Sequence, residues 1–166
     1  AAVGLAESEP RRGTVVAEIT LPVLIEMFEV MVEIEALCAR FAARRMVPAR
    51  LAEIETRHAE AQEFVAAEDA DGFYRANVKF HEAIYAASQN GYLERQALTL
   101  SRRLSPFRRL QLRRPRRLAT SNREHGEIIA ALVAADPDEA AAVMRRHVSV
   151  QGEGLVDLFR MFSGSG

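Results

Sequence analysis

Apolar residues recur every three to four positions along most of this chain of 166 residues, which is the period of an α-helix with one buried face. Strict alternation of apolar and polar positions, the pattern of a half-buried strand, is scarce. The pattern predicts six helices, over residues 22–45, 48–67, 69–88, 92–113, 122–135 and 137–162. Because most of the connections are short, neighbouring helices should run antiparallel. The sequence therefore predicts an all-α protein, an antiparallel bundle of six to seven helices.

Residues at the predicted helix ends refine these boundaries. Ser121 followed by Glu124 forms a capping box, which places the start of the fifth helix directly after Ser121. Asp136 before Pro137 is typical of an N-cap and first turn, here of the sixth helix. Pro106 falls inside the fourth helix and should kink it or split it in two, so the bundle can have a seventh helix.

The two ends of the chain lack the helical pattern. Residues 1–19 are rich in small residues and include the short β-like run Thr14–Val16. They are predicted to be a linker or the tail of an upstream domain. Residues 20–162 form the predicted helical domain, and residues 163–166, Ser-Gly-Ser-Gly, are predicted to be a disordered tail.

Composition fits one soluble globular domain, with 49% hydrophobic and 27% charged residues. No apolar run approaches the roughly 18 residues that a membrane span needs, so no membrane partner is expected. Cys38 is the only cysteine, which excludes an internal disulfide. A cytoplasmic location is the simplest prediction.

Positive charge is concentrated in one segment. The net charge is −1, but residues 102–117 contain eight arginines and no acid, which leaves 14 basic against 23 acidic residues elsewhere. This distribution excludes a uniformly basic nucleic-acid binder. Three interpretations of this cluster stay open. It is a solvated surface, or it contacts nucleic acid directly, although no interleaved aromatic residues support that, or one or two of its arginines turn inward. In the last case Arg102 and Arg103 are the candidates to bind a ligand carboxylate.

Three histidines fall on the apolar faces of three different predicted helices: His81, His125 and His147. Asn77 precedes His81 by one helical turn and shares its face. A single buried histidine usually has a hydrogen-bonding role in the core, but three unpaired buried imidazoles would be costly, and one metal ion satisfies all of them. Imidazole suits divalent transition metals, with zinc foremost and nickel or another metal as alternatives. His58 has mixed polar and apolar flanks and is predicted to be a boundary residue outside this group.

Two other functions remain open for a helical bundle with three histidines. Catalytic zinc sites also have three protein ligands and an open position, so a metal-dependent enzyme is the alternative. The run that starts at His81 begins like a zincin motif, but Tyr85 stands where the second histidine should be. Glu82 and Glu124 are chain neighbours of candidate ligands, so each is turned about 100° away and neither is expected to act as a base. The third possibility is a scaffold whose histidines bind no metal.

Three segments resemble one known family. They are Phe73–Asn90, Glu124–Leu132 and Asp136–His147, and they are similar to the FCD domain, the C-terminal effector domain of the FadR subfamily of GntR-type bacterial transcription regulators. The first predicted helix also fits, and the resemblance covers about residues 20–160. It implies an all-α bundle that forms a homodimer and binds a small carboxylate effector, with a metal held by the three histidines and an acid.

The resemblance also implies a winged-helix DNA-binding domain on the N-terminal side, which is absent from this chain. Arg12–Val16 resembles the end of its wing. The chain would then be the ligand-sensing and dimerisation domain of a regulator. It would contact DNA only through that missing domain, and effector binding would shift the population between two arrangements.

The chain departs from the family pattern at two positions. Asn77 stands where members usually carry Asp, so a divalent metal on three neutral imidazoles and an amide would keep its full charge. Many members have an arginine in the first helix, near the position of Met31 here, that helps to bind the effector. An arginine from the 102–117 cluster can replace it. Tyr74 and Tyr85 bracket His81 at helical spacing, and they either pack in the core or line the effector cavity.

Overall fold

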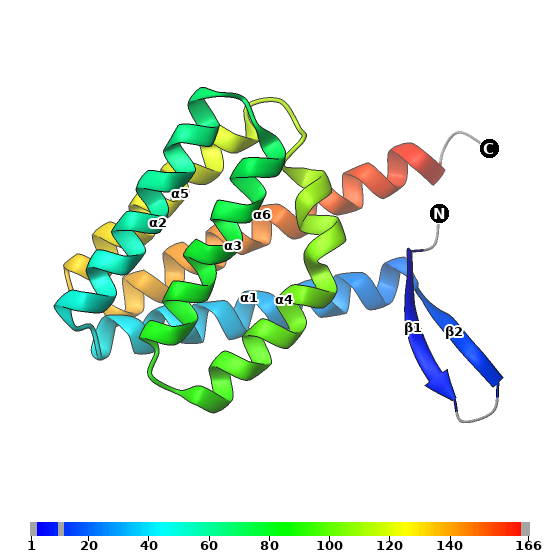
Figure 1. The fold of residues 1–166 in the computed structure, drawn as a ribbon, viewed down its shortest axis with the longest axis horizontal. Helices are drawn as coiled ribbons and strands as arrows, with labels where there is room; N and C mark the ends of the chain where they lie inside the picture. The colour runs from blue at the N-terminus through cyan, green and yellow to red at the C-terminus, as the bar shows by residue number, and fades with distance from the viewer. Residues whose placement is uncertain (1–2, 10–11, 164–166) are drawn as a thin grey trace.

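The computed structural model describes the backbone of residues 3–9 and 12–163 and the side chains of residues 19–150. Within these residues two strands precede six helices (Figure 1). The elements are β1 (Val3–Glu9), β2 (Arg12–Ile19), α1 (Leu21–Arg44), α2 (Pro48–Ala66), α3 (Ala70–Ala87), α4 (Gly91–Gln111), α5 (Arg117–Val133) and α6 (Pro137–Ser163). The all-α prediction is confirmed, and each predicted helix has a counterpart.

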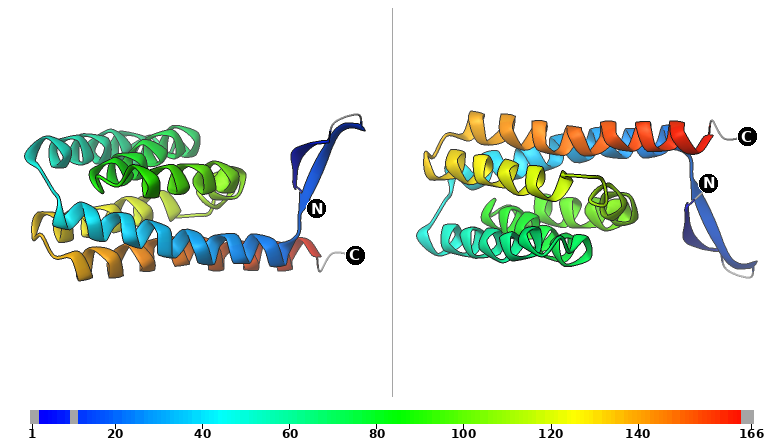
Figure 2. Two further views of the ribbon diagram at one scale, coloured as in Figure 1. Left: turned by 90° about the horizontal axis from the view of Figure 1, so that it is seen from below. Right: turned by 90° about the horizontal axis from the view of Figure 1, so that it is seen from above.

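The six helices surround one interior. α1 and α6 lie side by side and antiparallel along one side of the bundle (Figure 2). α2 packs against α3, and α5 contacts both α2 and α6. α4 packs against α1 and α3. This arrangement brings the inner faces of α1, α3, α5 and α6 together, and the candidate site lies between them.

The interior is filled by the apolar faces that the helical period predicts. Its largest fully buried side chains come from all six helices and are Leu24, Met31, Ile54, Phe73, Phe80, Ile84, Tyr85, Leu104, Ile128, Leu132 and Met144. Burying one aliphatic or aromatic side chain of this kind contributes about 1.5–3 kcal/mol. The helices are therefore held mainly by the shared core rather than by their intrinsic helix propensity.

Acidic N-caps begin two of the helices. The Asp69 side chain accepts hydrogen bonds from the backbone N–H groups of Asp71 and Gly72 at the start of α3. Asp136 accepts from the N–H groups of Asp138 and Glu139 at 3.1 and 3.0 Å, so the predicted cap of the last helix is confirmed. Each cap satisfies N–H groups that have no partner within the helix.

The predicted start of the fifth helix is wrong. α5 begins at Arg117, after Arg116 in the left-handed conformation with φ 62°. Ser121 lies inside the helix and is buried. Glu124 does not cap the helix, because its carboxylate accepts hydrogen bonds from Arg117 and His147 instead. Partners from another turn and another helix outweighed the local capping pattern.

Pro106 does not divide the fourth helix. α4 is one helix from Gly91 to Gln111 with Pro106 inside it, and it bends along its length (Figure 1). Proline removes one backbone hydrogen bond and crowds the preceding turn, which is enough to bend a helix that packing holds together. The described chain therefore has six helices rather than seven.

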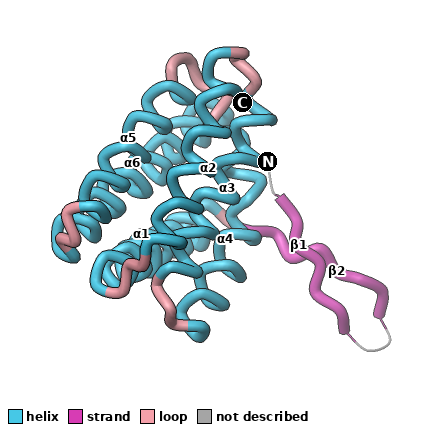
Figure 3. The backbone as a smooth tube through the Cα atoms, turned by 60° about the vertical axis from the view of Figure 1, so that its left-hand side comes forward, coloured by secondary structure: helices cyan, strands magenta, loops and turns pink. Residues whose placement is uncertain are grey.

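Two strands lie in the N-terminal segment, which was predicted to be a linker or the tail of an upstream domain. β1 and β2 pair antiparallel, with Val3 opposite Ile19, and form a hairpin that extends from the start of α1 (Figure 3). The β-like run Thr14–Val16 lies in β2. At the other end Ser163 is the last residue of α6, and the rest of the predicted tail, residues 164–166, lies outside the described residues. No helix in the described part of the chain is long and apolar enough to cross a membrane.

Candidate metal centre

The three predicted histidines converge inside the bundle. His81 on α3, His125 on α5 and His147 on α6 are each at most 1% exposed. Each offers a ring nitrogen, and these three atoms lie within 4.8 Å of one another. The ring centroids are 4.8–5.4 Å apart. The helical periodicity therefore correctly predicted that these residues share one interior.

Two carboxylates fix the orientation of two of these rings. Nδ1 of His81 lies 2.5 Å from Oε2 of Glu35, and Nδ1 of His147 lies 2.7 Å from Oε2 of Glu124. An ionised carboxylate only accepts hydrogen bonds, so both Nδ1 atoms carry the proton. A neutral ring in this orientation has its lone pair on Nε2. Carboxylates commonly orient metal-binding histidines in this way.

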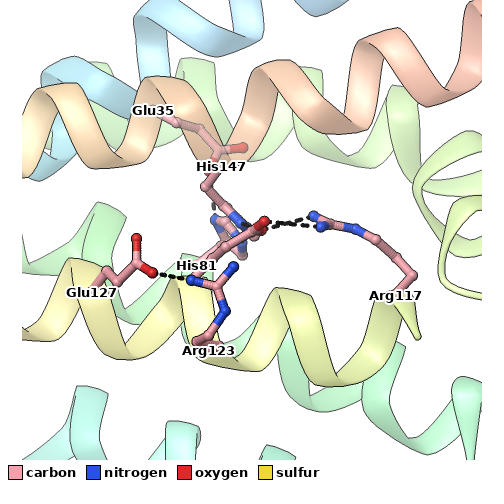
Figure 4. Close-up of polar contacts among 7 residues, drawn as sticks. Glu35, His81, Arg117, Arg123, Glu127 and His147 are labelled. Carbon is pink, nitrogen blue, oxygen red and sulfur yellow. Dashed lines mark hydrogen bonds and ion pairs between the residues drawn. The ribbon is translucent and has the colours of Figure 1, made fainter.

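The two Nε2 atoms lie 3.3 Å apart. Figure 4 shows His81 and His147 together between the helices. Two lone pairs at this distance repel unless a cation lies between them. Two nitrogens bound to one zinc ion at about 2.0–2.1 Å in tetrahedral geometry are themselves roughly 3.4 Å apart. The observed separation therefore fits two ligands of one transition-metal ion.

His125 is the third member of the group, and neither of its ring nitrogens has a hydrogen-bond partner. Its ring stacks on Phe80 with centroids 4.1 Å apart. Burial, with the charges of His147 and His81 adding to it, holds the pKa of His125 well below its usual value. The ring is therefore neutral and has a lone pair for a metal. His58 is only partly buried, 6.3 Å from His125 between ring centroids, as expected for a boundary residue.

The carboxylates behind the histidines are ionised although they are buried. Burial by itself would raise the pKa of Glu35, but Arg108 and His81 outweigh it and hold this pKa far below its usual range. Burial likewise opposes ionisation of Glu124, and hydrogen bonds from His147 and Arg117 lower its pKa to about 2. Burial lowers the pKa of His147 to about 4, although Glu124 acts in the opposite direction.

Each carboxylate also binds an arginine. Glu35 accepts a hydrogen bond from Arg108, and both side chains are buried. Glu124 receives both terminal nitrogens of Arg117 at 3.0 and 3.1 Å. The two carboxylates thus hold one histidine and one arginine each. The arginines keep the carboxylates charged, and the carboxylates keep the histidines in the orientation that a metal requires.

The roles of Glu35 and Glu124 were not predicted from the sequence. Glu35 lies one helical turn after Met31 in an otherwise apolar stripe of α1, and this buried acid was the signal that could have found it. Glu124 was expected to turn away from the histidines. It does lie on a different side of α5 from His125, but α6 packs against that side and brings His147 to it. A helical wheel cannot give the position of the neighbouring helix.

Asn77 lies beside this group but makes no hydrogen bond through its side-chain oxygen. It is buried on the same face of α3 as His81, and its Oδ1 has no partner. It lines a small cavity together with Arg108, Gln111, Leu112 and Arg117. An unpartnered buried oxygen fits a ligand atom, so a bond from Asn77 to the metal stays a prediction.

The arginines that turn inward are not those predicted from the sequence. Arg102 and Arg103 are exposed, whereas Arg108 is buried. The reason is that α4 continues through Pro106, so its inner face recurs at Leu104, Arg108 and Gln111. Residues 102 and 103 fall on the outer face.

The two predicted tyrosines have different surroundings. Tyr85 is fully buried next to Arg108, and burial raises the pKa of its hydroxyl well above the usual value. Tyr74 is only partly buried and packs against a separate apolar cluster around Phe73 and Leu112. Tyr85 therefore borders the candidate site, and the surroundings of Tyr74 are those of a packing residue.

Comparisons with known proteins agree with this architecture. The FCD domain family model matches residues 26–150. The structure of E. coli McbR/YncC is 21% identical, with a TM-score of 0.80 over 92% of this chain and 77% of that one. A GntR transcriptional regulator from Rhodococcus sp. RHA1 gives 17% identity, a TM-score of 0.70 and coverage of 92% and 73%. A metal-free FCD domain of a transcriptional regulator is 18% identical, with a TM-score of 0.70 over 87% of this chain and 99% of that one. No curated protein sequence matches the chain.

The structural neighbours are too distant in sequence to show more than the fold. The family model, in contrast, covers most of the chain and includes the segments that carry His81, His125 and His147. It confirms the resemblance seen in the sequence and gives no support to the alternative of a metal-dependent enzyme. The chain belongs to the FCD domain family, the effector-binding domains of GntR-type transcription regulators.

Proposed function

We propose that this chain senses a small organic acid at a bound metal ion, as the effector domain of a cytoplasmic regulator of the FadR subfamily. The observation that carries the proposal is the pair of Nε2 atoms of His81 and His147, which face each other at 3.3 Å with a carboxylate behind each ring. In a core without a cation, this arrangement would place two nitrogen lone pairs against each other. The partnerless ring of His125 supports the same conclusion.

His81, His125 and His147 would hold the ion, and the amide oxygen of Asn77 is the candidate for a fourth ligand. Neutral imidazoles favour zinc among the common metals of proteins, with nickel as the next candidate. When bound, the metal supplies a positive charge and open coordination positions for an acidic ligand. The protein contributes the rigid ligands and a buried surrounding in which charges interact strongly.

The charges around the site favour an anionic ligand. Glu35 and Glu124 neutralise Arg108 and Arg117, and histidines that bind a metal as neutral imidazoles add no charge, nor does Asn77. The residues thus sum to zero, and a divalent ion would keep its charge of +2. The cavity lined by Asn77, Arg108 and Arg117 is the place where a carboxylate could compensate this charge.

The same contacts provide a route from the ligand to the rest of the molecule. Glu35 on α1 binds His81 on α3 and Arg108 on α4, so a ligand that displaces either side chain also acts on α1. α1 follows directly after β2, whose sequence resembles the end of a wing. Effector binding would therefore shift the population between arrangements that place a winged-helix DNA-binding domain differently.

A second copy of the chain is the proposed partner. α1 exposes Val23, Val30 and Leu37, which are spaced by seven residues and form one stripe. Glu26 lies near one end of this stripe and Arg44 near the other, and both are exposed. Antiparallel pairing of two α1 helices would bring opposite charges together and cover the apolar side chains, as a two-fold symmetric dimer requires.

A thermal-shift series tests the proposal. Di- and tricarboxylates, hydroxy acids and sugar acids are added to metal-loaded protein and to protein stripped with a chelator. A ligand at a hundredfold excess over its Kd adds about 2.7 kcal/mol to the stability of the folded state, which moves the melting temperature by several degrees. We expect the shift only with metal. An equal shift of the stripped protein, or none at all with metal, would contradict a metal-centred effector site.

A further inference from the structure

His58 on α2 is the one histidine of the four in this chain that is partly exposed, and it is not a member of the three-histidine group. Its Nδ1 is buried and has no hydrogen-bond partner among the described residues. Its ring centroid lies 6.3 Å from that of His125 and 6.1 Å from that of Phe80, which stacks on His125. His58 therefore reaches from the surface to the edge of the candidate metal centre.

The space beside His58 is open where α2 packs against α5 (Figure 1). Gln62 on α2 accepts a hydrogen bond from Asn122 on α5, and one turn away on each helix lie His58 and Gly126. A Cβ built on Gly126 would have one neighbouring atom within 4 Å outside the backbone of its own helix, Nε2 of His58 at 3.9 Å. The missing side chain thus leaves room next to His58, directly after His125 in the chain.

An ion must pass between packed side chains to reach the three candidate ligands, because each of them is at most 1% exposed. On the side of α4, Arg108 and Arg117 line the small cavity next to the site. A guanidinium group has donors but no lone pair, so neither arginine can bind a cation on its way in. His58 differs from them, because a neutral imidazole offers a lone pair to transition metals.

The distance between His58 and His125 suits an exchange of ligands. With a zinc–nitrogen bond of about 2.0–2.1 Å, the centroids of two imidazoles on one zinc ion lie roughly 5–6.5 Å apart. The observed separation of 6.3 Å falls within this range. One ion can therefore contact both rings, and a bond to His58 can be replaced by a bond to His125 without the transfer of a proton or an electron.

We infer that His58 is a transfer residue, through which a transition-metal ion enters and leaves the three-histidine centre. It binds the ion only in passage and is not one of the final ligands. This inference rests on the proposed function and extends it to the way in which the site is loaded. Because neither the metal-free nor the loaded state has a bond between His58 and the ion, the residue should affect the rates of zinc binding and release but not the equilibrium affinity.

Stopped-flow measurements with zinc test the inference. Mixing the metal-free chain with zinc and a fluorescent zinc indicator gives the loading rate, and mixing the loaded chain with excess chelator gives the release rate. His58→Phe keeps an aromatic ring beside Phe80 but removes both ring nitrogens. We expect both rates to fall by about tenfold or more, which corresponds to about 1.4 kcal/mol of barrier. Chelator competition at equilibrium should give the affinity of the native chain.

The matched control is Ala59→Gln, because Ala59 is the next residue of the same helix and is exposed. It should leave both rates unchanged. His58→Gln is a second variant, which removes the imidazole and keeps a neutral polar side chain. It replaces His58→Phe if that variant has a lower melting temperature without metal, and the same fall in both rates is expected.

Each result has one meaning. A native chain that binds no zinc at the three histidines contradicts the proposed function and the inference with it. Zinc that binds to and leaves the native chain and both His58 variants at the same rates overturns the inference alone. A lower equilibrium affinity in these variants also overturns it, because His58 would then stabilise the loaded state as a ligand or a packing residue.

Discussion

Glu35 accepts hydrogen bonds from His81 and Arg108 while it is fully buried, so its charge affects both the candidate metal centre and the core. In Glu35→Gln, His81 loses its orienting acceptor, and we expect metal affinity to fall about 10–100-fold. Arg108 would lose the buried carboxylate that balances its charge, which costs roughly 3–5 kcal/mol of unfolding free energy. Chelator competition measures the first effect and urea denaturation the second.

The control for this variant is Glu33→Gln on the same helix. Glu33 pairs with Arg145 at the surface, and such exposed pairs contribute about 0–1 kcal/mol. Metal affinity should not change in the control. If Glu35→Gln retains metal as well as the control does, Glu35 does not orient a metal ligand.

Asn77→Asp should tighten metal binding. The substitution adds a negative charge beside the buried position where the ion is proposed to lie, and opposite charges attract strongly in such surroundings. We expect at least a tenfold gain in the apparent affinity measured by chelator competition, roughly 1.4 kcal/mol. Equal or weaker retention would show that Asn77 is not a ligand or that the site is built around the neutral amide.

The metal-free domain should lose stability as the pH falls below 7. Burial holds the pKa of His147 at about 4 and that of His125 well below its usual value, so both rings stay neutral in the folded domain. The unfolded chain binds these protons below about pH 6.5, and each histidine then costs about 1.4 kcal/mol per pH unit. Glu35 and Glu124 add to the loss only at lower pH, because their lowered pKa values matter below about 4.5.

Urea denaturation in the presence of a chelator measures this effect at about pH 7 and about pH 5.5. We expect a clear fall in the unfolding free energy at the lower pH. Equal stability at both pH values would mean that the histidines are not held neutral in the folded domain.

At the scale of the helices, periodicity was enough to find the residues that meet inside the bundle. His81, His125 and His147 were predicted because each follows the apolar stripe of its own helix, and a stripe faces the core in almost any packing. Periodicity could not predict which helices pack against each other. Glu35 and Glu124 needed the positions of α3 and α6 relative to α1 and α5.

The predicted start of the fifth helix was wrong, and of the two outcomes predicted for Pro106 the fourth helix shows a bend and not a split. The fifth helix starts four residues before Ser121, after Arg116 adopts a left-handed conformation that a non-glycine residue rarely has. The fourth helix tolerates Pro106, and this continuity makes Arg108 the inward arginine instead of Arg102 or Arg103. In both cases tertiary packing overrode a preference of the local sequence.

The exposed stripe on α1 gives a prediction for a whole helix. Val30 is 53% exposed at the middle of the stripe formed with Val23 and Leu37. Val30→Glu would place a charge on each side of the proposed two-fold interface, and the two charges would repel. Sedimentation velocity should show a dimer for the native chain and a monomer for this variant.

Val133→Glu is the matched control, because Val133 is 58% exposed on α5, away from this stripe. Its sedimentation should equal that of the native chain. A native chain that sediments as a monomer at micromolar concentration, or a Val30→Glu variant that remains a dimer, would contradict the proposed α1 interface.

At the scale of the molecule, five helices contribute to one polar centre inside an apolar core. α1 and α5 supply the carboxylates, α3, α5 and α6 the histidines, and α4 and α5 the arginines. A buried network of this kind is expensive unless all its members are satisfied. A metal ion and an acidic ligand would satisfy the members that still lack partners, and this couples ligand binding to the packing of the whole bundle.

The most direct test of the account is an anomalous-difference map from crystals of the chain purified without chelators, with data on both sides of the zinc absorption edge. The account predicts one peak per chain, within about 2.0–2.3 Å of Nε2 of His81, Nε2 of His147 and one ring nitrogen of His125. A map without a peak at the three histidines, in protein shown to be saturated with metal, would contradict the metal centre and leave a structural role for these residues.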